Sequence, residues 1–163
     1  MKLGYFLADN FCARYYLLLR FERTEIVKLL LEKGADPMIP SNSLLTPLHS
    51  AARRGFLDIC SLLLKDPRVE PTVGLGSGGV QPFHLACISG NRELCELFLR
   101  NGADITSNSR TKYTPLHVAS FQGHEEVCHL LIETGNCVVL RKRNVIVRGN
   151  VRSLVQRSRV FLC

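Results

Sequence analysis

The chain has 163 residues, of which 46% are hydrophobic, and it contains no Trp. This length supports one domain with a hydrophobic core, and no run approaches the 18 uninterrupted apolar residues of a membrane span. The net charge of +7 lies wholly in residues 136–163, since residues 1–135 hold 14 Lys and Arg against 14 Asp and Glu. That balance excludes a general attraction of the first 135 residues to nucleic acid or anionic membrane.

The first residues of the chain and its cysteines indicate in which cellular compartment the protein is expected. Asp9 and Arg14 interrupt the first apolar residues before the core of a signal peptide could form. Seven cysteines are an odd number, and Cys60, Cys95 and Cys128 lie at positions expected in helix cores. Reduced thiols fit this usage better than a disulfide framework. We therefore expect a cytoplasmic protein, with the nucleus as the alternative.

The first predicted helix covers residues 25–33. The run Glu25-Ile-Val-Lys-Leu-Leu-Leu-Glu-Lys33 has apolar residues at helical spacing, and Gly34 is a stop signal. The residues before it, which include Tyr15 and Tyr16, contain neither an N-cap residue followed by Pro nor a clear helix start. A connector rich in turn residues follows over 35–45.

The next unit begins at Thr46, whose hydroxyl can cap a helix that starts at Pro47. We predict helices near 47–54 and 57–65, separated by Gly55, and in the last unit we expect Gly123 to end its helix in a left-handed conformation. In the second helix of each unit, Leu62, Leu97 and Leu130 recur at one position, which we expect to belong to the core.

The same pattern recurs in two further units. Thr46-Pro-Leu-His-Ser-Ala51 aligns with Gln81-Pro-Phe-His-Leu-Ala86 and with Thr114-Pro-Leu-His-Val-Ala119. The apolar pairs that start at Ile26, Ile59, Leu94 and Val127 follow one another at 33, 35 and 33 residues. A period near 33 with the pattern T-P-L-H-x-A is the signature of ankyrin repeats, and over residues 13–135 the chain resembles that family.

The resemblance implies an all-α ankyrin-repeat solenoid, in which stacked helix-turn-helix units are joined by hairpin loops. Residues 1–34 would form a degenerate first repeat, 35–135 three further repeats, and 136–163 a basic tail rich in Val and Arg. The recurring His49, His84 and His117 would be structural, joining neighbouring repeats. Gln81 is a poorer cap than Thr, which predicts a weaker start for its helix.

Two local patterns suggest other chemistry, and the repeat context argues against both. Gly74, Gly76 and Gly79 satisfy G-x-G-x-x-G, but a dinucleotide site needs this motif between a strand and a helix in a βαβ unit. His124 and Cys128 are spaced as metal ligands on a helix, but no second pair completes a tetrahedral site. We therefore expect no cofactor and no metal.

The tail matches no repeat and contains no acidic residue. Its Val residues favour strand, so a short hairpin near Gly149 and a disordered segment are the two alternatives. The cluster Arg141-Lys-Arg143 is a weak nuclear-import or nucleic-acid signal. We expect at most weak binding of nucleic acid or anionic membrane through this tail.

The resemblance implies a non-enzymatic scaffold or adaptor that binds another protein through its concave face and hairpin tips. No nucleophile-elbow, phosphate-loop or zinc-protease motif occurs in the chain. The alternative is a fragment of a larger ankyrin-array protein, such as a TRPA-type cation channel or a multidomain signalling enzyme. The partner-facing positions of the family, two residues before each inter-helix Gly and the hairpin tips, correspond here to Arg53, Arg54, Ile88, Ser89, Phe121, Gln122, Asn42, Ser43, Leu45, Ser77, Val80, Arg110, Thr111 and Tyr113.

Overall fold

The computed structural model describes residues 23–41, 45–74, 79–109 and 113–135, and the geometry below refers to these ranges. They form helices and connectors and contain no β-strand. The helices are α2 (Thr24–Glu32), α3 (Pro47–Arg54), α4 (Leu57–Leu64), α5 (Pro82–Ser89), α6 (Arg92–Arg100), α7 (Pro115–Gln122) and α8 (Glu125–Gly135).

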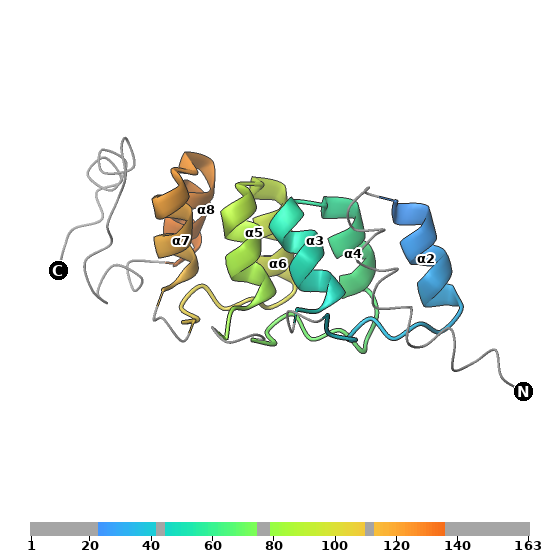
Figure 1. Cartoon of the computed structure of the whole chain (residues 1–163). Coiled ribbons are helices and arrows are strands. Elements are labelled where there is room, and N and C mark those ends of the chain that lie inside the picture. Colours follow the sequence, from blue (N-terminus) through green and yellow to red (C-terminus); the bar gives the residue numbers. More distant parts are fainter. Residues whose placement is uncertain (1–22, 42–44, 75–78, 110–112, 136–163) are drawn as a thin grey trace, which may run out of the picture.

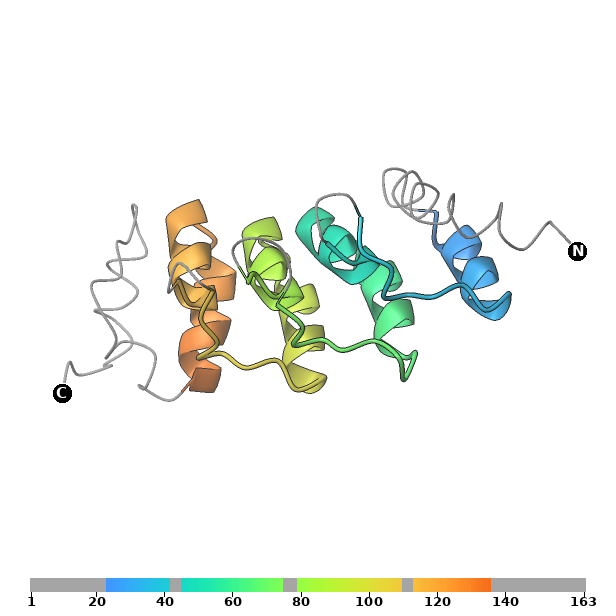
Figure 2. The ribbon, with the colours of Figure 1, turned by 60° about the horizontal axis from the view of Figure 1, so that its bottom comes forward.

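The helices stand in two parallel rows. Helices α3, α5 and α7 form one row, called the inner helices below, and α2, α4, α6 and α8 form the other, called the outer helices (Figure 1). Each helix packs against the corresponding helix of the next repeat, α3 on α5 and α5 on α7, and likewise α2, α4, α6 and α8 in turn. The connectors run along one edge of the row (Figure 2). This arrangement confirms the expected all-α solenoid.

Local signals in the sequence account for where the inner helices begin and end. Thr46 accepts a hydrogen bond from the backbone N–H of His49, and the His49 ring accepts one from the backbone N–H of Thr46. Thr114 caps α7 in the same way. Gly55 and Gly123 end α3 and α7 with φ of 78° and 82°, a left-handed conformation that costs little only for glycine.

Small side chains on the inner helices let neighbouring repeats approach closely. Ala51, Ala86 and Ala119 occupy one equivalent position and are all completely buried. The outer helices fill the remaining space with larger side chains, and Phe98 packs against Phe83 with ring centroids 6.1 Å apart. One continuous hydrophobic core therefore runs along the stack between the two rows.

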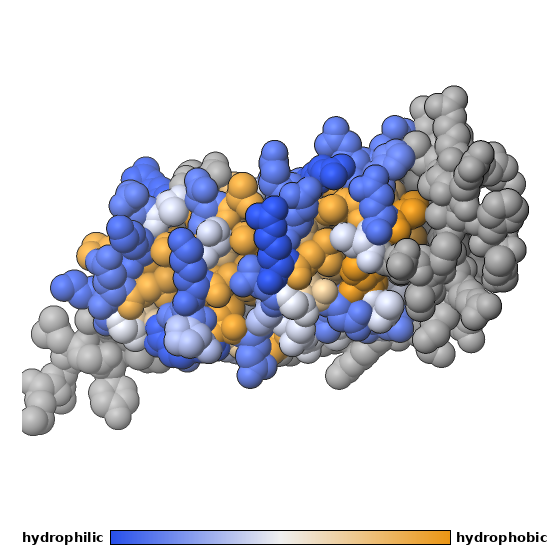
Figure 3. Space-filling model, turned by 180° about the vertical axis from the view of Figure 1, so that it is seen from behind, coloured by the Kyte–Doolittle hydropathy of each residue, from blue (hydrophilic) through white to orange (hydrophobic). Residues whose placement is uncertain are grey.

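The predicted core position is confirmed in α8, where Leu130 is buried, but needs a correction in α4 and α6. Leu62 and Leu97 are only half-buried, whereas Leu130 is 6% exposed. The fully buried position is the next one along, at Leu63, Phe98 and Leu131. In α4, residue i+3 from buried Cys60 returns to the same face of the helix, while residue i+2 lies about 200° around it. Leu62 and Leu97 therefore pack only against the edge of the core. The surface on the side of the outer helices, seen from behind in Figure 3, accordingly carries apolar side chains among hydrophilic ones.

The first repeat is described only from its second helix onward. Helix α2 forms where the sequence predicts it, but its N-cap residue, Arg23, makes no side-chain capping bond. Val27 is the one residue of α2 that is fully buried. Residues 1–22 and the tail, 136–163, lie outside the described residues, so the proposed degenerate repeat and basic tail stay predictions. In the described ranges, no helix has both the length and the apolar character needed to cross a membrane.

Candidate protein-binding face

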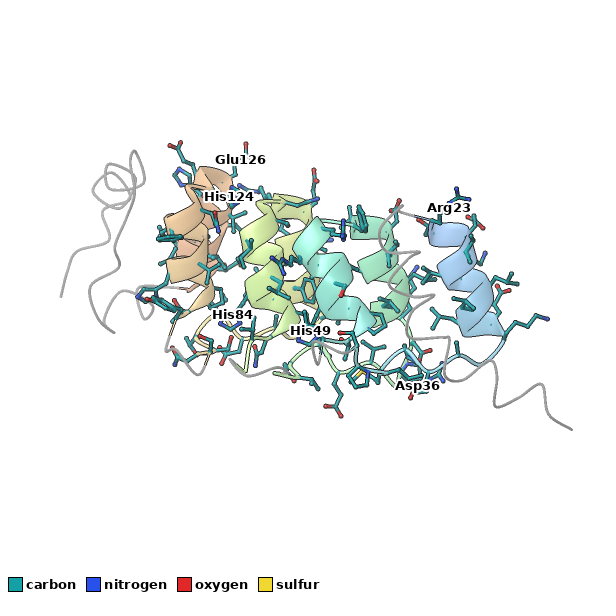
Figure 4. All side chains as sticks on the ribbon, viewed as in Figure 1. Arg23, Asp36, His49, His84, His124 and Glu126 are labelled. Carbon is teal, nitrogen blue, oxygen red and sulfur yellow. The ribbon has the colours of Figure 1, made fainter. Side chains whose placement is uncertain are left out.

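Two of the recurring histidines hold the connector that leads into the next repeat. The Nε2 atom of His49 lies 3.0 Å from the carbonyl oxygen of Val80, and that of His84 lies 3.1 Å from the carbonyl oxygen of Tyr113. A carbonyl oxygen can only accept, so Nε2 carries the proton in both rings. His49 and His84 both lie at the connector edge of the stack (Figure 4). The backbone positions of Val80 and Tyr113 are therefore set by the preceding repeat.

A second set of hydrogen bonds joins the repeats at the opposite edge. His124 lies near the turn between α7 and α8 (Figure 4), and its Nε2 donates to the carbonyl oxygen of Ile88 at 2.8 Å. The Asn91 side chain similarly donates to the carbonyl oxygen of Gly55 at 3.4 Å. Gly90 makes room for the His124 ring, because a Cβ at Gly90 would lie 2.6 Å from it. These bonds hold the turns at the ends of the inner helices in place.

The candidate face is built from positions that recur in each repeat. Residues directly before the helix-starting Thr or Gln form one column, Leu45, Val80 and Tyr113. Residues two places before the inter-helix Gly form a second, Arg53, Ile88 and Phe121, and those one place before it form a third, Arg54, Ser89 and Gln122. We call this set the inner face. Equivalent residues in the second column change from cationic to aliphatic to aromatic along the stack.

The most exposed large hydrophobic side chains of the inner face lie in the last described repeat. Tyr113 and Phe121 are 56% and 55% exposed, although both have large apolar side chains. The Tyr113 ring also lies edge-on to the ring of His117, with centroids 6.1 Å apart. Arg53, Arg54 and Gln122 are exposed, and Leu45, Val80 and Ile88 are half-buried. The inner face therefore presents two aromatic side chains at one end and two arginines at the other.

The remaining predicted site residues are either engaged locally or outside the described ranges. The Ser89 hydroxyl donates to the Ala86 carbonyl oxygen at 2.8 Å and accepts from the Asn91 backbone N–H. These bonds stabilise the turn after α5, so the hydroxyl already has a structural role. Lying outside the described residues are Asn42, Ser43, Ser77, Arg110 and Thr111.

Burial keeps the ionisable core residues neutral. It is the main cause of the lowered pKa of His49 and of His84, against which the hydrogen bonds to the Val80 and Tyr113 carbonyls act only partly. It also raises the pKa of the Cys60, Cys87 and Cys128 thiols. Neutral imidazoles with occupied Nε2 atoms and protonated thiols are poor general bases and poor nucleophiles. These side chains are suited to packing and hydrogen bonding rather than to chemistry.

Described residues of the two local patterns considered for other chemistry make structural contacts, and Gly76 lies outside the described residues. Gly74 and Gly79 approach so closely that a Cβ at Gly74 would lie 2.9 Å from the Gly79 carbonyl oxygen. His124 is bonded to the neighbouring repeat, and the Cys128 sulfur lies 3.6 Å from the Ser120 hydroxyl oxygen inside the core. No group of three or more His, Cys, Asp or Glu that could hold a metal ion occurs in the described ranges.

Sequence reasoning missed the second set of inter-repeat bonds. Asn91 and His124 both follow an inter-helix Gly directly, and that shared position is the signal that could have identified them. The second repeat has Phe56 there, whose side chain has no polar group to donate.

Comparisons with known families match most of the chain. A family model described as ankyrin repeats in many copies matches residues 11–64, and one described as ankyrin repeats in three copies matches residues 69–142. The matches include all seven helices described above.

Curated relatives from Homo sapiens are similar over about half of the chain. NF-kappa-B inhibitor epsilon is 32% identical over 99 residues, 55% of this chain. Neurogenic locus notch homolog protein 4 is 33% identical over 89 residues, also 55%. Transient receptor potential cation channel subfamily A member 1 is 29% identical over 79 residues, or 48%. The aligned regions span only 20%, 4% and 7% of these three relatives, respectively. Repeat period, fold and family matches agree: the chain belongs to the ankyrin-repeat family, whose members are protein-interaction modules built from stacked helix pairs.

Proposed function

We propose that this protein is a non-enzymatic adaptor that binds another protein through the inner face. The observation that carries the proposal is the exposure of Tyr113 and Phe121, which lie on the same repeat. In the described ranges, the large hydrophobic side chains that are exposed are these two and Leu29. Aromatic side chains and Arg are enriched among residues that dominate binding energy at protein interfaces.

The support beneath these side chains favours binding without large rearrangement. The backbones of Tyr113, Val80 and Ile88 are each held by a histidine from an adjacent repeat. A preorganised surface loses little conformational entropy when a partner binds. The inner face therefore has both the composition and the rigidity of a binding surface.

The proposal also covers the cellular location of the protein and the role of its basic tail. Buried, protonated thiols at Cys60, Cys87 and Cys128 suit a reducing compartment, so we place the protein in the cytoplasm, with the nucleus as the alternative. The cations of residues 136–163 would add only weak, salt-sensitive attraction to nucleic acid or anionic lipid.

Site-specific cross-linking in the full chain tests the proposal. A photoreactive residue at Gln122 on the inner face should capture a partner protein in cells, whereas one at Glu93 on α6 should not. Both positions are exposed, so the two variants differ in the face of the stack on which the photoreactive group lies and not in its accessibility. Capture of the same protein from both positions, or from Glu93 alone, would place the interface elsewhere.

The affinity of variants for the captured partner then measures how much each exposed aromatic side chain contributes to binding. Phe121→Ala and Tyr113→Ala should each weaken binding by about 2 kcal/mol, the lower bound usual for interface hot spots. Leu29→Ala is the matched control, because Leu29 is 51% exposed on outer helix α2. A larger loss from Leu29→Ala than from either aromatic change would contradict an inner-face interface.

A further inference from the structure

Charge is segregated between the two rows of helices. Within their bounds, the inner helices α3, α5 and α7 contain just two charged residues, Arg53 and Arg54, and no acid. Eight acids lie on the outer helices: Glu25, Glu32, Asp58, Glu93, Glu96, Glu125, Glu126 and Glu133. The one concentrated charge on the inner helices is therefore positive, and it lies at the end of α3.

The two arginines are not neutralised by the described part of the protein. The ion pairs found there join Arg68 to Asp66, and Arg92 and Arg100 to Glu96. No described carboxylate lies within ion-pair distance of Arg53 or Arg54. Cations at a helix C-terminus interact favourably with the helix dipole, which explains why α3 tolerates them. Their exposed guanidinium groups can still pair with carboxylates, singly or in bidentate geometry.

Charge also changes sign along the edge where inner helices turn into outer ones. Arg53, Arg54 and Asp58 sum to 2 − 1 = +1 at the turn between α3 and α4. At the turn between α7 and α8, Glu125 and Glu126 contribute −2, with His counted as neutral. A partner carboxylate is therefore attracted at the α3 end and repelled at the α7 end, a difference that sets orientation as well as affinity.

We propose that the inner face binds a protein segment with two separate blocks of side chains, an inference that rests on the proposed function. The carboxylates of the partner segment lie over Arg53 and Arg54, and its apolar block lies over Ile88 and Phe121. Glu125 and Glu126 exclude the opposite placement. The chemical class of the partner is thus an acidic segment adjoined by an apolar anchor.

Helix spacing predicts how far apart the two blocks lie. Neighbouring packed helices are about 8–10 Å apart, so the two steps from α3 through α5 to α7 cover roughly 16–20 Å. An extended chain advances about 3.3–3.6 Å per residue, so the carboxylates and the apolar anchor should be about five or six residues apart. A shorter spacing cannot reach both ends of the inner face in an extended conformation.

Labelled peptides and the full chain test this inference by fluorescence anisotropy. The test peptide carries three Glu, five Ser and then Leu-Phe, and the control peptide has the same composition with Glu and apolar residues interleaved. The segregated peptide should bind more tightly. Arg53→Glu with Arg54→Glu should weaken its binding at least about tenfold, since two attractions become repulsions.

Matched variants separate a local contact from a change in total charge. Lys28→Glu with Lys65→Glu makes the same charge change at exposed positions of the outer row, and it should leave binding within about twofold. A peptide with Lys in place of Glu should restore binding to the Arg53→Glu, Arg54→Glu variant. If that variant fails to fold, as judged by circular dichroism, Arg53→Gln with Arg54→Gln replaces it and should show a smaller loss in the same direction.

Three results would overturn the inference. These are equal losses in the two charge-reversal variants, equal binding of the segregated and interleaved peptides, and failure of both peptides to bind. Tighter, Arg53-dependent binding of a single-stranded oligonucleotide would indicate a nucleic-acid site instead.

The proposed function is tested separately, because cross-linking from Gln122 does not depend on the peptides. If cross-linking succeeds and the peptides fail, the inner face binds a protein of different chemistry.

Discussion

At the residue scale, the third repeat differs from its neighbours by one missing hydroxyl. In the second repeat the Thr46 hydroxyl oxygen lies 2.7 Å from Nδ1 of His49. Gln81 takes the place of this Thr in the third repeat and makes no side-chain capping bond. Among the described residues, Nδ1 of His84 is consequently buried without a hydrogen-bond partner. An unsatisfied buried polar atom costs free energy, so this position weakens the stack.

Gln81→Thr should therefore stabilise the protein. A restored N-cap contributes about 0.5–2 kcal/mol, and the new hydroxyl can also donate to His84. Urea unfolding at neutral pH measures the gain. The converse change, Thr114→Gln, is the control and should lower the free energy of unfolding by a similar amount. An unchanged midpoint for both variants would mean that the cap is energetically unimportant here.

The buried side chains of His49 and His84 should make the stability of the protein depend on pH. Burial lowers the pKa of His49 and His84 below their ordinary value of 6.5. The unfolded chain then binds more protons than the folded chain just below pH 6.5, so the free energy of unfolding should fall as the pH drops through that region. Above pH 6.5 this contribution is fully present.

Denaturant unfolding between pH 7.5 and pH 5 measures this slope. The double variant His49→Gln, His84→Gln should be less stable but should show a flatter dependence on pH over the same range. Greater stability of the natural protein at pH 5.5 than at pH 7.5 would contradict the assignment of neutral, buried imidazoles.

At the scale of the element, the orientation of each outer helix decides which leucine carries the packing. Leu63 is fully buried in α4, whereas its neighbour Leu62 is half-buried. Leu63→Ala should lower the free energy of unfolding by about 2–5 kcal/mol, the usual cost of a core cavity. Leu62→Ala removes the same atoms, so it is a matched control, and it should cost clearly less. Equal losses would mean that α4 is rotated from the orientation described.

Helix α2 should be the least stable of the described helices. It has no side-chain cap, buries only Val27 completely, and leaves Leu29 half exposed to water. A helix with few fully buried side chains opens at low free-energy cost. Native-state hydrogen exchange should show faster exchange for amides of α2 than for those of α4 and α6. Slower exchange in α2 would require packing that these features do not provide.

At the scale of the whole molecule, charge is divided between the repeats and the tail. Residues 1–135 are balanced and residues 136–163 carry seven cations with no acid. Binding to a random DNA duplex should therefore be weak and fall steeply with salt. Replacing the seven tail cations by Gln should abolish it, while the control Arg53→Gln, Arg54→Gln should retain most of it. Salt-independent binding, or binding that survives loss of the tail cations, would contradict this division.

The sequence by itself determined the family, the period and the ends of the inner helices. These features depend on signals a few residues apart: Thr46 before Pro47 caps α3, and Gly55 ends it. The substitution of Gln81 for Thr was also visible in the sequence and indicated a poorer cap, and Gln81 makes no side-chain capping bond. Such signals can be read without a structure, because each acts through bonds within one turn of helix.

Only the tertiary structure decided what depends on helix rotation and on neighbouring repeats. Adjacent leucines are alike in sequence, and the rotation of α4 alone buries Leu63 rather than Leu62. The bond from His124 to Ile88 joins residues 36 positions apart, so the recurring position after the inter-helix Gly does not by itself identify the partner. The separation of Arg53 and Arg54 from the acids likewise emerges when the helices sort into two rows, because a linear sequence does not show which helices share a face.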